Sequence, residues 1–222
     1  ETLERDISII KDLEIDQATF YPLMSSSSVK NKMTLALGNH GEGNEKEFYK
    51  CISEKLTNNY VQTSAWCFTR KGNLIDEYIV TRDYYIGVGA GSFSYLSVGM
   101  FATTFSINHY IDMINTGISS KTMGKYFSKK ERVLYSLLMS LFGGRMEFRE
   151  MKKSHGRFWS IYLFMELLFL FLSGAVIIRK GSVRVTNKGR YSMVSLMRNF
   201  FTMVNNIREQ CRRLSDKRDR AA

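Results

Sequence analysis

Apolar residues recur at helical spacing in two segments near the start of the chain, which predicts amphipathic helices over residues 3–14 and 45–57. Their apolar stripes are Leu3, Ile7, Ile10 and Leu13 in the first, and Phe48, Ile52 and Leu56 in the second. Short runs rich in β-branched and aromatic residues predict strands at 17–21, 60–69, 78–80 and 84–88. Residues 25–44, rich in Ser, Asn and Gly, predict a mobile loop. This rhythm of helix and strand is typical of an α/β unit.

The later part of the chain carries clearer helix boundaries. Ser106 is the expected N-cap of a helix that ends before Gly117. Ser128 and Glu131 fit the capping-box pattern at the start of another helix, which Gly143 and Gly144 end. The apolar stripe of that helix is Val133, Leu134, Leu137, Leu138 and Leu141.

Residues 158–222 predict an apolar helix at 158–172, two strands at 176–178 and 183–185, and a last helix that begins at Thr186. Together with the preceding helices, this order is the outline of a winged-helix module. The last helix carries a stripe of Met193, Val194, Met197, Phe201 and Val204, and its charged end from Arg208 to Arg220 is expected to be solvated.

The stretch 158–178 is long enough to be considered as a membrane span, because it has 21 residues and one charged residue among them, Glu166. That carboxylate would lie near the bilayer centre at a cost of about 3 kcal/mol. Ser173 and Gly174 also divide the stretch into a helix and a strand. The sequence therefore favours a buried core helix, and no membrane span is expected.

Charge divides the chain into two parts. Residues 1–124 carry 11 Lys or Arg and 14 Asp or Glu, and residues 125–222 carry 21 and 7, which leaves net charges of −3 and +14. This break predicts two domains, 1–124 and 125–222. The basic domain is either simply well solvated or it meets an anion such as nucleic acid, a membrane or a carboxylate-rich ligand.

Cysteine and histidine usage indicates no metal site. Cys51, Cys67 and Cys211 are far apart, in no ligand spacing and odd in number, which argues against a disulfide framework and fits a cytoplasmic protein. The three histidines, His40, His109 and His155, also fit no metal-ligand spacing, and the order of residues alone assembles no catalytic triad.

The run Gly87-Val88-Gly89-Ala90-Gly91-Ser92 is the clearest candidate for chemistry. Glycines let a backbone approach a ligand closely, and amides in such a turn hold anions. The run matches neither the dinucleotide fingerprint nor the P-loop, so a purely structural turn is the alternative. Trp66, Phe68, Tyr84 and Tyr85 are close in sequence and either stack on a flat ligand or belong to the core.

Several of these segments resemble the oxygen-independent coproporphyrinogen III oxidase family, which includes haem chaperone-like and anaerobic haem-degrading relatives. Residues 85–94 resemble its glycine-rich segment, 19–24 a late barrel strand, and 63–70 and 76–78 its post-barrel strands. Residues 185–190, Val-Thr-Asn-Lys-Gly-Arg, resemble the T-x-x-G step of its C-terminal domain. The resemblance implies an α/β fold: the late part of a (β/α) radical S-adenosylmethionine (SAM) barrel over 1–124, then a basic winged-helix-like domain over 125–222.

The resemblance also implies a function in porphyrin or haem metabolism. Such proteins use SAM and a [4Fe–4S] cluster on a C-x-x-x-C-x-x-C loop for oxidative decarboxylation or related chemistry on a tetrapyrrole, with a flavodoxin or ferredoxin as reductant. By position, the cofactor-binding residues are expected to be Tyr21, Pro22, Gly87, Gly89 and Phe93. The substrate pocket is expected to include Trp66, Phe68 and Tyr85.

The sequence departs from the family in one large respect, which is that it contains no C-x-x-x-C-x-x-C motif. The cluster ligands are expected to precede residue 1 in a longer oxidoreductase, and the 222-residue chain alone is expected to be inactive. The alternative is a winged-helix binding module for nucleic acid or an acidic protein. In that alternative, Arg190 and Arg198 face the partner. Because the apolar stripe of the last helix is expected to be buried, direct contact of this helix with nucleic acid is not favoured.

Overall fold

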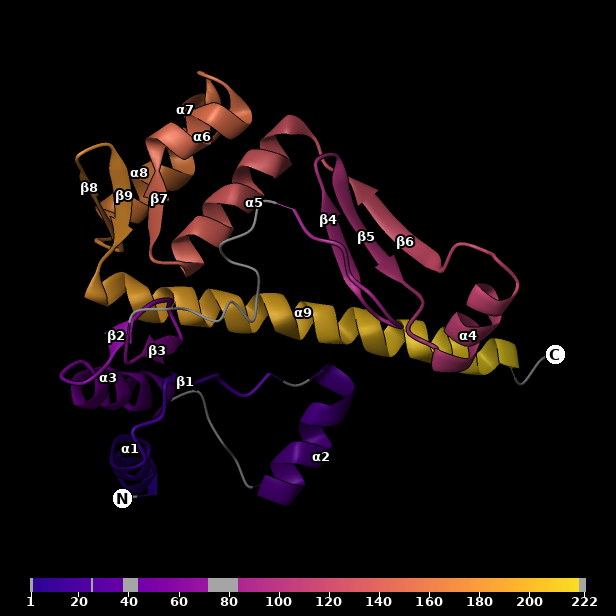
Figure 1. The fold of residues 1–222 in the computed structure, drawn as a ribbon, viewed down its shortest axis with the longest axis horizontal. Helices are drawn as coiled ribbons and strands as arrows, with labels where there is room; N and C mark the ends of the chain where they lie inside the picture. Colours follow the sequence, from indigo (N-terminus) through magenta and orange to yellow (C-terminus); the bar gives the residue numbers. More distant parts are fainter. Residues whose placement is uncertain (1, 25, 38–43, 72–83, 220–222) are drawn as a thin grey trace.

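The computed structural model describes residues 2–24, 26–37, 44–71 and 84–219 (Figure 1). Its first part packs α1 (Thr2–Asp12) and α3 (Glu45–Leu56) on a small antiparallel sheet of order β1-β3-β2. The strands are β1 (Gln17–Thr19), β2 (Val61–Gln62) and β3 (Cys67–Thr69). A cluster of Ile7, Ile52, Leu56, Tyr60 and Phe68 holds the two helices to this sheet.

The next three strands form a second antiparallel sheet of order β4-β5-β6. Helix α4 (Ile107–Asn115) lies in the connection between β5 and β6. The strands are β4 (Phe93–Leu96), β5 (Gly99–Thr103) and β6 (Lys121–Tyr126), and every residue of β6 is exposed. The domain boundary predicted between residues 124 and 125 lies inside β6. Ser106 caps α4 as predicted, because its hydroxyl accepts a hydrogen bond from the amide of His109 at 3.3 Å.

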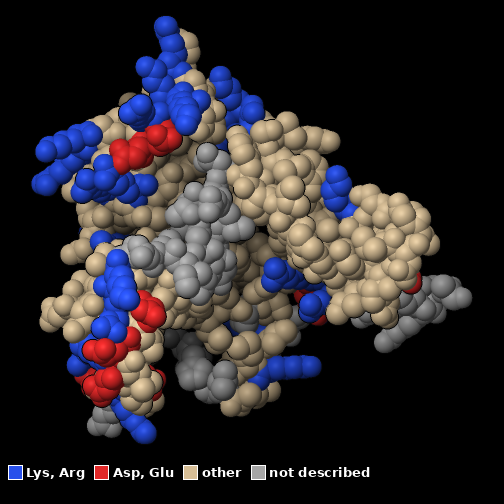
Figure 2. Space-filling view, in the orientation of Figure 1, with Lys and Arg blue, Asp and Glu red and all other residues tan. Residues whose placement is uncertain are grey.

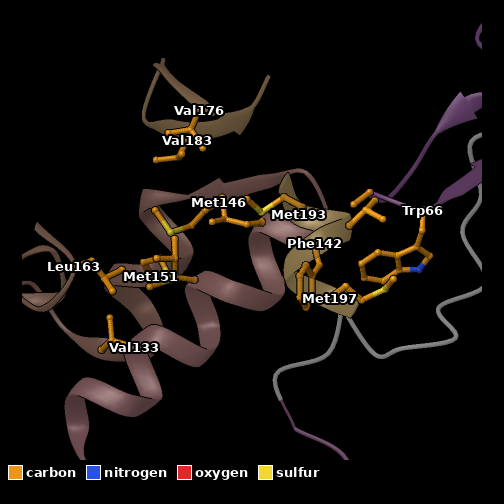
Figure 3. Packing of buried hydrophobic residues seen from close by; sticks show 14 of the residues in the cluster. Trp66, Val133, Phe142, Met146, Met151, Leu163, Val176, Val183, Met193 and Met197 are labelled. Carbon is orange, nitrogen blue, oxygen red and sulfur yellow. The ribbon is translucent and has the colours of Figure 1, made fainter. Parts of the chain in front are cut away.

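The rest of the chain runs helix, strand, three helices, hairpin and long helix. The helices are α5 (Lys129–Phe142), α6 (Phe148–His155), α7 (Trp159–Tyr162), α8 (Phe164–Leu172) and α9 (Asn187–Asp219). The strands β7 (Arg145–Glu147), β8 (Val176–Arg179) and β9 (Ser182–Val185) form a sheet of order β7-β9-β8. The main core lies here, between α5, α6, β7, the hairpin and the start of α9 (Figure 3).

Helix α9 runs through the whole molecule (Figure 1). Its 33 residues correspond to a length of about 50 Å. Its first turns pack against α5 and β9, and later turns pack against α2 (Ser27–Leu37). Near its charged end, the Arg208 guanidinium lies 5.8 Å from the centre of the Phe93 ring. The charged end is therefore anchored in part, which charge alone does not indicate.

Four expectations need correction. Residues 27–37, predicted as loop, form α2. The strand predicted over 60–69 is a hairpin of β2 and β3, closed by Ser64, whose hydroxyl accepts from the amides of Trp66 and Cys67. In α3, Tyr49 is buried together with Ile52 and Leu56, whereas Phe48 is exposed. Around Tyr84–Val88, predicted as a strand, there is one isolated bridge between Tyr85 and Tyr95, and the strand predicted at 78–80 lies outside the described residues.

A further correction concerns the apolar segment 158–172, which breaks at Leu163 into α7 and α8. Leu163, Leu167 and Leu170 pack on the core, but no residue of α8 is fully buried. The predicted buried core helix is therefore buried along one stripe alone. Within the described residues, no helix is long and apolar enough to cross a membrane.

The described strands pair antiparallel in three small sheets, whereas a (β/α) barrel has parallel neighbours. The expectation of a mixed α/β fold is met. Parallel pairing, the signature of the barrel part, is not present among the strands of the described ranges.

The capping box at the start of α5 leads to a pH prediction. The Glu131 carboxylate accepts from the Ser128 amide at 2.8 Å and lies 2.6 Å from Lys125 Nζ. Lys125 first, and then Ser128, lower the pKa of Glu131 from 4.5 to about 2. Since the pKa is lower in the folded state, this contribution to stability is present above pH 4.5 and is lost as pH falls toward 2.

The free energy of unfolding of a Glu131→Gln variant should therefore depend less on pH across that window than the free energy of unfolding of the wild type. Urea unfolding at several pH values measures this slope. Glu150→Gln, at an exposed position of α6, is the control and should keep the wild-type slope. Equal slopes for wild type and Glu131→Gln would contradict the prediction.

Candidate functional site

The glycine-rich turn joins the Tyr85–Tyr95 bridge to the second sheet. Gly87 lies against the chain that follows, because a Cβ there would stand 2.2 Å from the carbonyl oxygen of Phe93. Gly89 and Gly91 have φ values of 95° and 71°, which favour glycine. Gly89 and Gly91 are therefore favoured by their backbone conformation, and Gly87 is favoured because a side chain there would clash.

Hydrogen bonds to β5 occupy much of this turn. The Gly91 amide donates to the Thr104 carbonyl at 2.7 Å, and the Ser92 amide donates to the Thr103 hydroxyl at 3.0 Å. The hydroxyls of Ser92 and Thr103 both lie within hydrogen-bond distance of the Gly89 carbonyl, at 2.8 and 2.7 Å. The Gly87 amide donates to Ser94 Oγ at 3.1 Å. Three amides of the turn thus have internal acceptors, which supports the structural interpretation of this segment.

An aromatic cluster lies between the turn and α5. The Tyr95 ring lies 4.2 Å from the Tyr135 ring, centre to centre, and Phe127 packs on both. The hydroxyls of Tyr85 and Tyr135 are 3.3 Å apart. Burial raises the pKa of both hydroxyls, and the neighbouring Tyr85 raises the pKa of Tyr135 further. At neutral pH both groups are therefore neutral hydroxyls, suited to hydrogen bonding and not to acting as bases.

Phe93 lies at the other side of the turn. Its ring packs on Phe105 at 6.0 Å, and the Arg208 guanidinium lies over it. Sequence reasoning missed Arg208, because the charged end of the last helix gave no signal of a contact. This arginine is the one cationic group that the described structure brings onto a ring of the glycine segment.

The remaining predicted site residues lie in or beside the β1-β3-β2 sheet. Trp66 and Phe68 are 3% and 0% exposed, and the Trp66 ring packs edge-on against Phe142 at 5.2 Å. Tyr21 is tilted against Trp66 at 6.5 Å, and Pro22 is half-buried. The structure therefore places Trp66 and Phe68 inside hydrophobic clusters, while Tyr21 reaches the surface.

The eight predicted residues thus form two groups. One group lies at the β1-β3-β2 sheet and consists of Tyr21, Pro22, Trp66 and Phe68. The other lies in the segment that leads into β4 of the β4-β5-β6 sheet (Figure 1) and consists of Tyr85, Gly87, Gly89 and Phe93. Their roles toward cofactor and substrate remain predictions.

A polar network that sequence reasoning missed connects α9 to α3 and β2. Arg198 pairs with Glu45 at 2.5 Å, with side chains only 14% and 21% exposed. Arg190 contacts the Gln62 side-chain oxygen, and the Gln62 amide nitrogen lies 2.7 Å from the Tyr49 hydroxyl. Both arginines, expected to face a partner in the binding-module alternative, therefore have partners inside the chain.

The cysteines do not fit a [4Fe–4S] cluster, which needs at least three thiolates at one point. Cys67 is buried in the main core, Cys51 packs at the edge of the α1–α3 cluster, and Cys211 lies near the end of α9. Among the described residues no group of three His, Cys, Asp or Glu side chains is placed to hold a metal ion.

No protein-family model and no curated protein sequence matches the chain. Among solved structures, coproporphyrinogen III oxidase (HemN) from Escherichia coli, a radical SAM enzyme, is similar with a TM-score of 0.64 and 12% identity. The match covers 90% of this chain and 50% of that one, so the chain spans about half the length of the structure it matches. The resemblance inferred from the sequence is thereby supported at the level of the fold, which is similar to that of a radical SAM coproporphyrinogen III oxidase.

Proposed function

We propose that the chain is the C-terminal part of a radical SAM protein of porphyrin or haem metabolism, similar to coproporphyrinogen III oxidase. The observation that carries this is the extent of the structural match, 90% of the chain at a TM-score of 0.64. Isolated motifs are matched by chance far more readily than nine-tenths of a chain in one arrangement. The reaction itself, oxidative decarboxylation or related chemistry on a tetrapyrrole, belongs to the longer protein in this proposal, as does its reductant.

The proposed division is a barrel-derived part over 1–124 and a winged-helix-like part over 125–222. The second is supported by the order α5, β7, α6 to α8, β8 and β9, with β9 between its two neighbours in the sheet. That order of helices, strand and hairpin is the one expected of a winged helix. The proposed place of the whole protein is the cytoplasm, in line with three cysteines that are far apart in the sequence and odd in number.

Within this proposal, the turn at Gly87 and Gly89 and the ring of Phe93 face the cofactor with Tyr21 and Pro22. The cluster would be held by cysteines that this sequence does not contain, so no step through it follows from this structure. The contribution of the chain itself is positional. The neutral hydroxyls of Tyr85 and Tyr135 fix the glycine segment to α5, and Arg208 brings positive charge to Phe93.

The test is anaerobic iron–sulfide reconstitution of the longest natural form of the protein, with the 222-residue chain beside it. The long form should gain about four irons and cleave SAM, and the short chain should gain none. A titration of both forms with coproporphyrin III, followed by visible absorbance, tests the tetrapyrrole separately. A long form that binds no cluster, or the absence of any longer form, would overturn the proposal.

The alternative, a module that binds nucleic acid, has the net charge of +14 over residues 125–222 in its favour. Arg190 and Arg198 count against this alternative, because they contact Gln62 and Glu45 of the same chain. Titration of the short chain with duplex DNA at increasing salt tests it, since phosphate contacts require affinity to fall steeply with salt. Tight, salt-sensitive binding would favour this alternative over the enzyme.

A further inference from the structure

Helix α8 and the end of α7 present a large apolar face to solvent, here named the α7–α8 face. It consists of Ile161, Phe164, Met165, Leu168, Phe169 and Leu172. Phe169 is 71% exposed and Leu172 is 74% exposed. Within α8, the spacing places Phe164, Met165, Leu168, Phe169 and Leu172 on one side of the helix, opposite Leu167 and Leu170, which pack on the core. A contiguous apolar face of this kind on a folded protein marks a site of interaction.

The charge around this face is strongly positive. Residues 145–184 contain eight Lys or Arg and three Asp or Glu, a net charge of +5. Exposed arginines and lysines lie at both ends of the apolar segment, Arg157 before it and Arg179 and Lys180 after it. Figure 2 shows Lys and Arg gathered over the region where α6, α7 and the β8–β9 hairpin lie in Figure 1.

Two contacts sharpen this charge pattern. Arg145 and Arg184 stand directly opposite each other on β7 and β9, an arrangement that like charges disfavour, and Glu147 pairs with Arg145 on one side of it. The single acid of the apolar segment, Glu166, lies off the face and 3.8 Å from Lys130 Nζ. The face itself therefore carries no negative charge.

These features select among the possible occupants. The six side chains have no hydrogen-bond donor for phosphates or bases, which nucleic acid requires of the helix that meets it. A second copy of the chain would bring two identical basic surroundings together in a symmetric interface. Protein partners generally form about one hydrogen bond per 100–200 Å² of interface, and this face offers none from its side chains.

We propose that the α7–α8 face docks on the surface of a membrane that contains anionic lipids. Its aromatic and aliphatic side chains enter the boundary between headgroups and acyl chains, about 5–10 Å deep, and the surrounding lysines and arginines meet the lipid phosphates. Nine residues of α8 span about 14 Å, which is less than half of the apolar thickness of a bilayer. The helix therefore lies in the interface and does not cross. This inference stands apart from the proposed enzymatic function.

The test is co-sedimentation of the 222-residue chain with vesicles of phosphatidylcholine alone, or of phosphatidylcholine mixed with phosphatidylglycerol. The chain should bind the mixed vesicles and bind less as salt increases. The double variant Phe164→Ser with Phe169→Ser should lower the partition coefficient about tenfold or more. Arg179→Glu with Lys180→Glu should lower it about tenfold, on the anionic vesicles alone.

The matched control is Ile107→Ser with Ile111→Ser on α4, which has exposed isoleucines at the opposite end of the molecule (Figure 1). That variant should bind as the wild type does, and circular dichroism verifies that all variants fold. Three results would overturn the proposal: no binding to either vesicle, binding that ignores the phenylalanine changes, or a dimer in light scattering that Phe169→Ser dissociates. The last result would assign the face to a second copy.

Discussion

Replacing Trp66 with alanine is expected to lower the free energy of unfolding by about 3–5 kcal/mol. The side chain is 3% exposed and lies in the main core against Phe142, while its backbone carbonyl accepts from the Phe20 amide at 3.0 Å. Alanine would leave a cavity where β3 meets the end of α5. The residue connects two parts of the fold, so both should lose stability together. Urea unfolding followed by circular dichroism measures the change.

The control is Tyr21→Leu, which alters the partner of the same ring at the surface and should cost less than about 1 kcal/mol. A Trp66→Phe variant separates packing from ligand binding, because it keeps most of the apolar volume. If Trp66 also lined a substrate pocket, Trp66→Phe would stay folded and lose affinity for coproporphyrin III. A Trp66→Ala variant as stable as the wild type would contradict the assignment of this residue to the core.

The second large effect is expected for Gly189→Ala at the start of α9. A Cβ at this position would stand 1.9 Å from the carbonyl oxygen of Ala175, which is backbone and has little freedom to move. That carbonyl also accepts from the Thr186 amide at 2.9 Å, so the clash would separate the helix from the hairpin. Alanine is the better helix former by about 1 kcal/mol, yet the overlap should outweigh that gain and destabilise by about 2–3 kcal/mol.

Thermal unfolding of Gly189→Ala tests this, with Ser192→Ala as the control at an exposed position of the same helix. The control should change stability by less than about 0.5 kcal/mol. An unchanged or raised melting temperature for Gly189→Ala would show that α9 shifts freely against Ala175. The same contact gives a physical reason for the T-x-x-G step at residues 186–189. Thr186 Oγ1 accepts from the Gly189 amide at 3.0 Å, and the glycine admits the carbonyl.

Features that depend on a few neighbouring residues were predictable from the sequence. The caps at Ser106, Ser128 and Thr186 each act within three residues, and all three hydrogen bonds are present. The β8–β9 hairpin also follows from a local turn, since Lys180 and Gly181 have φ values of 45° and 76°. In contrast, the β4–β5 hairpin has no counterpart among the sequence-based predictions.

Burial was harder to predict, because it depends on what lies opposite. The hydrophobicity of 158–172 predicted a core helix, but α8 has a packed partner on one side only. The candidate site shows the same difficulty. Trp66 and Phe68 are aromatic residues near a glycine turn in sequence, but they pack inside the clusters of the first sheet and α5. Nothing local indicates that Glu45 and Arg198 form a pair.

That ion pair joins residues 153 positions apart, and it lies where α9 meets the start of α3. During synthesis on the ribosome, Glu45 and Gln62 emerge long before the helix that supplies their arginines. The first sheet therefore completes its polar contacts only after almost the whole chain has been made. We expect the early part of the protein to depend on chaperones while it waits, and a ribosome stalled before residue 190 should hold a nascent chain that proteases cut readily in its first 70 residues.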